Sequence, residues 1–293
     1  MRLARGFTLV DLIVVLAVLV LLVVVALPML HSKGCGNRQL KDSTQVRAIH
    51  QGMIVWAQSG IDDYPIPSRI DRSNATVFEE GPAKDTTANI YSCMVFSGVI
   101  APEVLVSPLE VNPNVRVMED YEFKHPATAR DPEHAAWDPK FSAGLTGDRP
   151  GNASYAHRQP SGGRRAGWCN DFSAERLAVC TRGPEIASVR KNPDGSVTPT
   201  LANPKSNTLL FFGKSKSWSG NMAFNDNHVD FLKDWLTPGK PFKKDRTYTA
   251  ADGKHWPDLW CYDEPEDPKA ANDYLGIFLK AGAEPKDFKA AWD

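Results

Sequence analysis

The sequence has little of what catalytic, zinc-binding or disulfide-rich proteins display. It holds only five cysteines in 293 residues, and no two of them form a Cys-x-x-Cys pair, which argues against a structural zinc site and a disulfide scaffold. No Gly-x-Ser-x-Gly elbow, phosphate-binding loop or His-Glu-x-x-His motif occurs. The formal net charge is -1, so no basic excess indicates nucleic-acid binding. We therefore expect a protein that is not an enzyme and has no nucleic-acid partner.

Long apolar-periodic runs are scarce, whereas proline and glycine are abundant. The 22 prolines and 21 glycines favour a body rich in loops and short strands over a helical bundle. If that body lies outside the cytoplasm, one or two disulfides are an open alternative, and Cys169 and Cys180 are the nearest pair in sequence.

The one long apolar run lies at the start of the chain. Every residue in Leu12–Leu27 is Leu, Ile, Val or Ala, and Phe7–Leu30 would form about 36 Å of helix. That length crosses a hydrocarbon core of about 30 Å. Arg2 and Arg5 precede the run, which predicts a cytoplasmic N-terminus and a body on the outer side of the membrane.

One carboxylate, Asp11, stands near the start of this run. An acid at the centre of a membrane helix costs about 2.5–3.5 kcal/mol, and near an end it costs less than that. Asp11 as a tolerated acid at a helix N-terminus is one interpretation. A plain signal anchor fits the length but leaves Asp11 unexplained, and a cleaved secretory signal would have a shorter apolar core.

The segment Arg5-Gly6-Phe7-Thr8-Leu9-Val10-Asp11 resembles the leader and cleavage site of type IV prepilins and pseudopilins. The resemblance implies a cut between Gly6 and Phe7 and methylation of the new N-terminus at Phe7. The family usually has Glu where Asp11 stands, and it tends to carry a proline late in the helix, as Pro28 does here. The resemblance covers about the first sixty residues strongly and the rest loosely.

Cleavage would create a charge for Asp11 to meet. When subunits stack, the Asp11 carboxylate of one lies within reach of the Phe7 ammonium of its neighbour, and in low dielectric either charge alone is costly. This pair would set the axial register of subunits, as a buried polar residue does in a coiled coil.

The chain beyond the apolar run predicts a second helical half. The breaker-rich patch His31–Gly36 suggests a bend or partial melting, and Ser59-Gly60 should end the helix. The apolar positions between them follow helical spacing, which predicts a stripe that docks the helix on a sheet. Helical spacing resumes at Leu40, and the stripe consists of Val46, Ile49, Met53 and Trp56.

The body shows weaker patterns. The predicted elements are a long loop at 61–84, a short helix at Thr87–Phe96, a turn and strand at Gly98–Pro108, surface insertions at 126–150 and 158–200, and a buried strand at Asn207–Gly213. Gly98–Pro108 and Asn152–Ala156 resemble segments of a large group of bacterial pilin-like proteins.

A β-hairpin is predicted at Gly220–Leu232. Asp226 and Asn227 suit the two left-handed positions of a type I′ turn, and His228 follows them. The hairpin resembles the C-terminal Asp-Gly-type hairpin of the same pilin-like group, which is the closest resemblance for the body.

Metal binding is an alternative at two places. Asp226, His228 and Asp230 cluster near the hairpin tip, and an acidic run includes Asp258, Asp263 and Glu264. The run lacks the spaced Asp-x-Asp-x-Asp-Gly pattern of calcium loops, so we expect no cofactor and leave calcium open. Four tryptophans crowd the C-terminal quarter, where core packing is favoured over a ligand surface. They are Trp235, Trp256, Trp260 and Trp292.

Together these patterns predict an α+β fold with a long N-terminal helix, transmembrane and then amphipathic, packed on an antiparallel sheet with large loop insertions. The expected organisation is a leader at 1–6, a transmembrane half at 7–30, an amphipathic half at 31–59 and a periplasmic or extracellular globular domain at 60–293.

The expected function is that of a structural pilin-like or pseudopilin subunit of a type II secretion pseudopilus or a type IV pilus-like filament. Its partners would be identical or related subunits, a prepilin peptidase and methylase, and an inner-membrane secretion or pilus platform. The protein would cross the inner membrane once. The alternative is a membrane-anchored extracytoplasmic binding protein that does not polymerise, and a third, an anchored hydrolase, lacks a nucleophile constellation.

Overall fold

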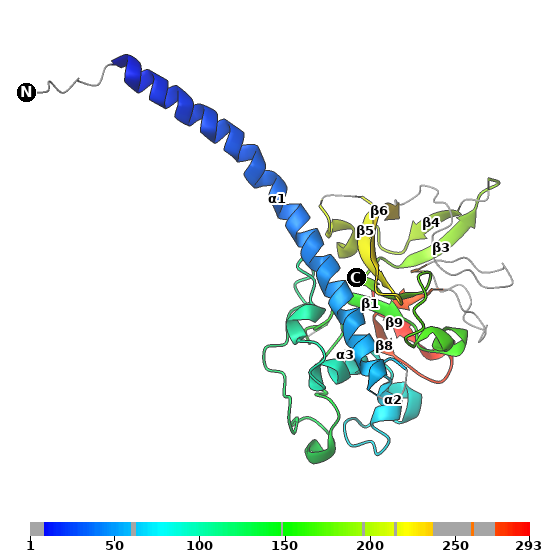
Figure 1. The fold of residues 1–293 in the computed structure, drawn as a ribbon. Coiled ribbons are helices and arrows are strands. Elements are labelled where there is room, and N and C mark those ends of the chain that lie inside the picture. The colour runs from blue at the N-terminus through cyan, green and yellow to red at the C-terminus, as the bar shows by residue number, and fades with distance from the viewer. Residues whose placement is uncertain are drawn as a thin grey trace, which may run out of the picture.

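The computed structural model describes residues 9–59, 63–147, 149–194, 197–213, 216–236, 259–260 and 273–293, without the side chains at 11, 21, 23–35, 191 and 197. One long helix runs beside a body of short helices and antiparallel strands (Figure 1). The fold is therefore α+β, as predicted.

The long helix α1 spans Leu9–Gln58 without interruption. Partial melting at His31–Gly36 was the wrong expectation, because the backbone is helical through this patch and α1 only curves gently (Figure 1). A glycine inside a helix costs about 1 kcal/mol, which propagation of the flanking turns offsets. The helix ends where predicted, with Ser59 in a turn that donates to the Trp56 carbonyl.

The central sheet has five antiparallel strands in the order β6-β5-β2-β1-β7. Both of its faces are buried, so alternate residues enter different cores: Tyr155 faces α1, whereas Ala156 faces away from it. The strands are β1 Tyr155–Arg158, β2 Leu177–Thr181, β5 Trp218–Phe224, β6 Val229–Leu236 and β7 Leu275–Gly276.

Short elements surround this sheet. Two short α-helices are α2 Pro67–Ile70 and α3 Thr87–Phe96. The 3-10 helices are η1 Gly81–Lys84, η2 Pro102–Leu105, η3 Pro132–His134, η4 Gly162–Gly167, η5 Asn207–Leu210 and η6 Pro285–Asp287. Two small antiparallel ladders pair β3 Ile186–Lys191 with β4 Val197–Leu201 and β8 Phe278–Lys280 with β9 Lys289–Ala290. The predicted helix at Thr87–Phe96 is confirmed, with Thr86 as its N-cap accepting from the Asn89 N–H.

Two predicted strands are wrong. Gly98–Pro108 contains η2 in place of a strand, because Pro102 starts a 3-10 turn and Pro108 lacks a donor for a sheet ladder. Asn207–Gly213 begins with η5, whose first turn is capped by the Ser206 side chain. Asn152–Ala156 enters a strand only at Tyr155, where β1 starts.

The segment 158–200 is also more than a surface insertion. Leu177–Thr181 forms β2 at the middle of the sheet, with every residue buried. Cys180 therefore lies in the core, and no disulfide joins it to Cys169, so the pair considered for a disulfide is not bonded. The apolar run that forms β2 is only four residues long, too short to stand out among charged loops.

Among the predicted tryptophans near the C-terminus, Trp260 is buried in the core, and Trp235 and Trp292 are half-buried and pack against it, as expected. The Trp218 ring lies 5.3 Å from Trp260, and Trp260 lies 6.4 Å from Trp292, all edge to face. Gly183 permits this packing, because a Cβ there would sit 2.2 Å from the Trp260 ring. Trp256 lies outside the described residues.

Candidate assembly site

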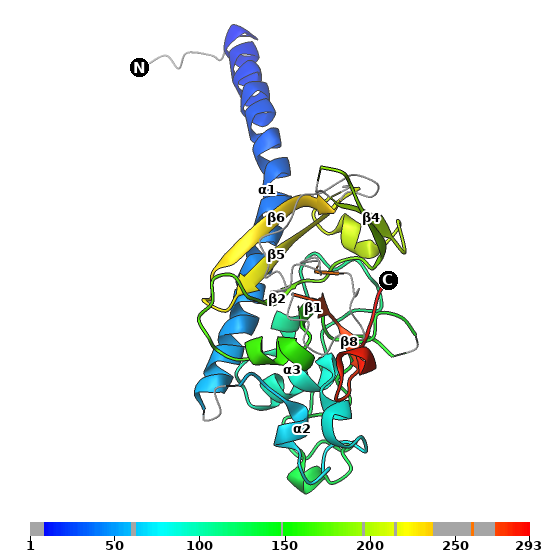
Figure 2. The same ribbon diagram turned by 90° about the vertical axis from the view of Figure 1, so that its right-hand side faces the viewer.

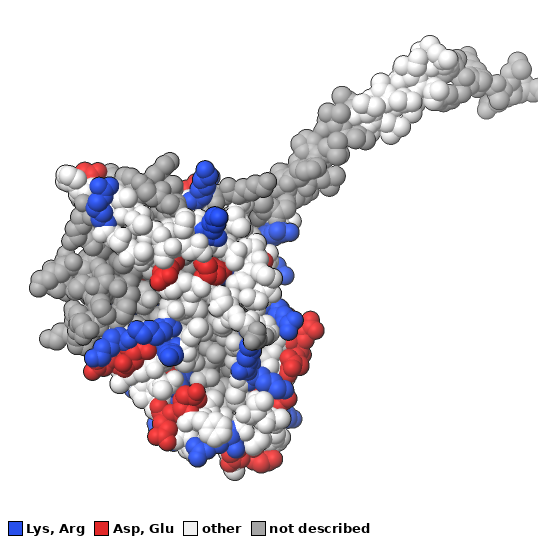
Figure 3. Space-filling view, turned by 180° about the vertical axis from the view of Figure 1, so that it is seen from behind, with Lys and Arg blue, Asp and Glu red and all other residues white. Residues whose placement is uncertain are grey.

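The first half of α1 extends away from the body (Figures 1 and 2). Large apolar side chains that the structure describes here are all exposed, between 48% at Val15 and 74% at Leu9. The described part of this arm carries no charged side chain in the view of Figure 3, whereas acidic and basic residues are interspersed over the body. The eleven exposed side chains are Leu9, Val10, Leu12, Ile13, Val14, Val15, Leu16, Val18, Leu19, Val20 and Leu22.

The processing residues lie outside this description. Gly6 and Phe7 are outside the described residues, and Asp11 is placed in α1 without its side chain. Within the described part of the chain, no helix reaches the length and apolarity needed to cross a membrane. The expected span at 7–30 includes residues and side chains beyond that part.

The second half of α1 docks on the sheet through an apolar stripe. Val46, Ile49 and Met53 are 0% exposed and join the core formed with the sheet and α3, which confirms the predicted stripe. Gly52 lies in the same seam, where a Cβ would come within 2.6 Å of the Ile100 side chain, so the helix approaches closely here. Trp56, the last residue of the stripe, is half-buried and packs against a separate small cluster of Val77, Cys93 and Trp137, whereas Leu40, before the stripe, is 68% exposed.

A buried carboxylate anchors the start of this docked half. Asp42 is 0% exposed and accepts four hydrogen bonds. Its Oδ1 accepts from Ser107 Oγ at 2.5 Å and Tyr155 OH at 2.8 Å. Its Oδ2 accepts from Thr181 Oγ1 at 2.8 Å and Asn221 Nδ2 at 2.7 Å. Four neutral donors thus replace the water that the carboxylate loses, and three of them come from β1, β2 and β5.

Two further polar residues of α1 extend this seam. Gln45 Nε2 donates to the Glu103 and Val106 carbonyls, and its Oε1 lies 3.1 Å from Tyr155 OH. Burial, followed by the nearby Asp42 carboxylate, raises the pKa of the Tyr155 phenol well above its usual value, so this donor stays protonated. The seam is therefore specified by polar contacts as well as by apolar packing.

His50 joins α1 to the hairpin tip. Its Nε2 lies 2.9 Å from Tyr64 OH, and its Nδ1 lies 3.1 Å from Asn227 Oδ1. Tyr64 OH in turn donates to Asn225 Oδ1 at 3.0 Å. Burial lowers the pKa of His50, although the Asn227 and Asn225 amides oppose that shift. His50 thereby contacts one end of the turn at Asn227 directly and the other end at Asn225 through Tyr64.

The hairpin at β5 and β6 is confirmed, but its turn is of another type. Asn227 has a φ of 68°, whereas Asp226 does not have a positive φ. The Asn227 N–H donates to the Phe224 carbonyl and the Phe224 N–H to the His228 carbonyl, which gives a three-residue loop closed by a left-handed residue. The physical reason is that Asn225 is buried and held by Tyr64 and Asp171, which fixes the loop from outside.

The metal candidates are not gathered in the described residues. His228 Nδ1 contacts Asp226 Oδ1, and the imidazole stacks on Phe224 at 4.3 Å between ring centroids. No group of three His, Cys, Asp or Glu side chains in the described ranges could hold a metal ion. Asp258, Asp263 and Glu264 lie outside the described residues.

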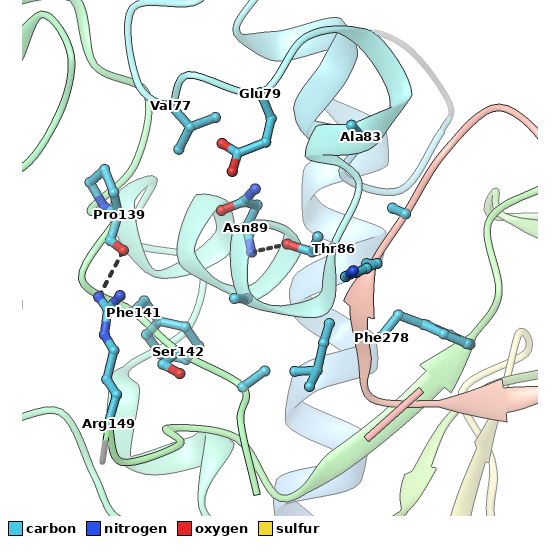
Figure 4. A pocket seen from close by; sticks show the side chains of 15 residues that line it. Val77, Glu79, Ala83, Thr86, Asn89, Pro139, Phe141, Ser142, Arg149 and Phe278 are labelled. Carbon is cyan, nitrogen blue, oxygen red and sulfur yellow. Dashed lines mark hydrogen bonds between the residues drawn. The ribbon is translucent and has the colours of Figure 1, made fainter. Parts of the chain in front are cut away.

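A cleft of about 570 Å³ opens on the body, and its described lining includes no residue of α1 (Figure 4). Its walls come from 77–89, 139–149 and β8. The Phe278 N–H at the start of β8 donates to Thr87 Oγ1 at 2.7 Å, and that hydroxyl contacts His157 Nε2 at 2.8 Å. Two walls of the cleft are thus joined through buried polar contacts.

Sequence reasoning missed the polar seam and the cleft. Asp42, Gln45 and His50 look like the solvated face of an amphipathic helix, yet all three are buried. Their spacing of three and five along α1 places them beside the apolar stripe, which was the available signal. Comparisons with protein families, with curated proteins and with solved structures find no match to the chain.

Proposed function

We propose that the chain is a structural pilin-like or pseudopilin subunit of a type II secretion pseudopilus or type IV pilus-like filament. The apolar half of α1 holds it in the inner membrane, with the globular domain on the outer side. A prepilin peptidase cuts after Gly6 and methylates Phe7, and subunits then assemble on a membrane platform through their N-terminal helices.

The observation that carries the proposal is the exposure of the arm. Eleven large apolar side chains of α1 are exposed, because no other part of the described chain covers them. Burying each of them is worth about 1.5–3 kcal/mol, so the whole arm would gain on the order of 15–30 kcal/mol from an apolar partner. Lipid supplies that partner before assembly, and neighbouring helices supply it in a filament.

The docked half of α1 supports the same function. Because the arm continues into a helix held by Asp42 and the apolar stripe, the position of the arm determines the position of the body. In a filament, the axial position of each N-terminal helix would then fix the axial position of its globular domain, which requires a rigid connection between the two.

A membrane-anchored binding protein that does not polymerise is the second candidate. The cleft of about 570 Å³ favours it, since ligand sites have volumes of about 300–1,000 Å³. Such a protein would use the arm only as an anchor, and its membrane fraction would contain no filaments.

The intact mass of the protein, extracted from membranes of a cell with a prepilin peptidase, tests the proposal. The expected mass lacks Met1–Gly6 and carries one added methyl group. Filaments sheared from the same cells should contain this processed form. An uncut N-terminus would overturn the processing, and a processed protein that never enters filaments would favour the binding protein.

A further inference from the structure

The cleft between α3, the 139–149 loop and β8 carries charges of both signs at its rim. Glu79 stands beside Val77 on one wall, and Arg149 extends along the opposite side past Phe141 (Figure 4). Lys280 of β8 lines the cleft as well, and all three charged residues are exposed. None of them forms an ion pair with another residue that the structure describes.

Arg149 is positioned for a ligand even without an acidic partner. Its Nη2 donates to the Pro139 carbonyl at 3.0 Å, which orients the guanidinium and leaves its other N–H groups available. A guanidinium in a fixed orientation binds a carboxylate through two parallel hydrogen bonds.

The floor between the charges is apolar. Phe141 is 3% exposed, Val77 is 9% exposed and Leu279 of β8 is 47% exposed, and the three come from three different segments. The Thr87 and Phe278 contact joins two of those segments, so the floor is formed before any ligand arrives. A preformed apolar floor favours a ligand that carries at least one apolar group.

Hydrogen-bond donors lie between the floor and the rim. Thr86 Oγ1 accepts from Asn89 N, and Ser142 Oγ accepts from Gly144 N, but neither hydroxyl hydrogen has an acceptor among the described residues. Asn89 Nδ2 donates one hydrogen to the Lys84 carbonyl, which leaves its second hydrogen available. These donors match carbonyl oxygens that lie between two charged ends.

The geometry points to a site for a short zwitterionic peptide with an apolar side chain. Its ammonium would pair with Glu79, its carboxylate with Arg149, its peptide carbonyl with Thr86 or Ser142, and its side chain would cover the floor at Phe141. The site does not depend on filament assembly, because every wall belongs to one chain and none to the arm.

Three dipeptide probes test the assignment by isothermal titration with the full chain in detergent micelles. Ala-Phe carries both charges, N-acetyl-Ala-Phe lacks the ammonium, and Ala-Phe-amide lacks the carboxylate. Ala-Phe should bind, and each capped peptide should bind at least about tenfold more weakly, since each loses a charge-assisted pair.

Variants identify which charge each end meets. Glu79→Gln should weaken Ala-Phe and Ala-Phe-amide but leave N-acetyl-Ala-Phe unchanged. Arg149→Gln should weaken Ala-Phe and N-acetyl-Ala-Phe but leave Ala-Phe-amide unchanged, and Lys280→Gln should act in the same direction more weakly. Glu175→Gln and Arg190→Gln, which alter exposed residues away from the cleft, should change nothing.

Three outcomes would overturn the site: no binding of Ala-Phe by the wild-type chain, equal affinity for all three peptides, or variants that weaken all probes alike. The processing and assembly of the arm would stand in each case, because intact mass and filament yield measure them separately. Retained thermal unfolding of the variants shows that the site and not the fold was changed.

Discussion

The two halves of α1 form one continuous helix with opposite surroundings. In the first half, leucine, isoleucine and valine side chains are exposed; in the second, Asp42 and His50 are 0% exposed. Soluble helices usually bury the apolar side chains and expose the charged ones. The two halves therefore differ in role. The arm is the part that we propose to be covered by lipid or by neighbouring helices, and the docked half fixes one orientation of α1 on the sheet.

The polar residues of the docked half give orientation where apolar packing alone would not. An apolar stripe tolerates a shift of one helical turn more readily than a carboxylate that must meet four donors. Asp42 therefore does for the helix and its sheet what Asp11 is proposed to do between subunits. Asp42 sets a register within the chain, and Asp11 is proposed to set one between chains.

The largest expected effect is on assembly and concerns the arm. Asp11→Asn removes the charge proposed to meet the neighbour's Phe7 ammonium, so we expect membrane insertion without filaments. Asp11→Glu is the matched control, because it keeps the charge and restores the residue usual in the resembled family. Sheared-filament yield measures both. Filaments from Asp11→Asn at the wild-type level would show that the register does not depend on this pair.

The largest expected effect on stability concerns Asp42. Asp42→Ala removes the shared, strongest acceptor of the Ser107, Tyr155, Thr181 and Asn221 donors in a buried seam, which should lower the free energy of unfolding by about 3–5 kcal/mol. Urea unfolding followed by circular dichroism measures it. Lys41→Ala, one residue earlier and exposed, should change stability by less than about 0.5 kcal/mol. A similar small loss for both variants would contradict the anchoring role of Asp42.

A pair of isoleucines compares the two halves directly. Ile49 is 0% exposed and Ile13 is 58% exposed in the same helix. Ile49→Ala should lower the free energy of unfolding by about 2–4 kcal/mol, because it opens a cavity in the core. Ile13→Ala should leave unfolding of the body in detergent within about 0.5 kcal/mol. Equal losses at both positions would mean that the arm folds against the body.

His157, in strand β1 of the sheet on which α1 docks, should make the free energy of unfolding depend on pH. Burial lowers the pKa of His157 to about 4, below the unfolded value of about 6.5. The unfolded chain therefore binds the proton first, and stability falls as pH drops through 6.5 towards 4. The loss for this residue is about 2 kcal/mol between pH 7 and pH 5. The difference between wild type and His157→Gln in urea unfolding at the two pH values isolates it. An identical pH slope in both proteins would refute the assignment.

The sequence revealed those parts of the molecule whose signals are local. Helical spacing identified Val46, Ile49 and Met53, and the short helix predicted at Thr87–Phe96 is α3. The hairpin was found because its two strands are adjacent in the chain. Such features depend on residues within one or two turns of each other, so pattern and propensity are sufficient.

The parts that were missed depend on distant residues. β2 pairs with β1 and β5, but no sequence pattern near Leu177 predicts that this segment lies between those two strands. The Asp42 donors lie 65 to 179 residues away along the chain, and the cleft joins three remote segments. A buried carboxylate and a solvated one look alike until the fold supplies the donors.

The smallest expected effect concerns the hairpin turn, which depends both on its own backbone conformation and on a contact with the distant helix α1. Asn227 has a φ of 68° and its side-chain oxygen contacts His50 of the docked half. Asn227→Gly keeps the backbone relaxed but loses that contact, at a cost of about 0.5–1 kcal/mol. Asn227→Ala loses the contact and adds about 1 kcal/mol of left-handed strain. The difference between the two variants in urea unfolding thus measures strain, and the Gly variant measures the contact with α1. If Gly proved neutral, the turn would be held by its own conformation, and His50 would stabilise the docked half through Tyr64 alone.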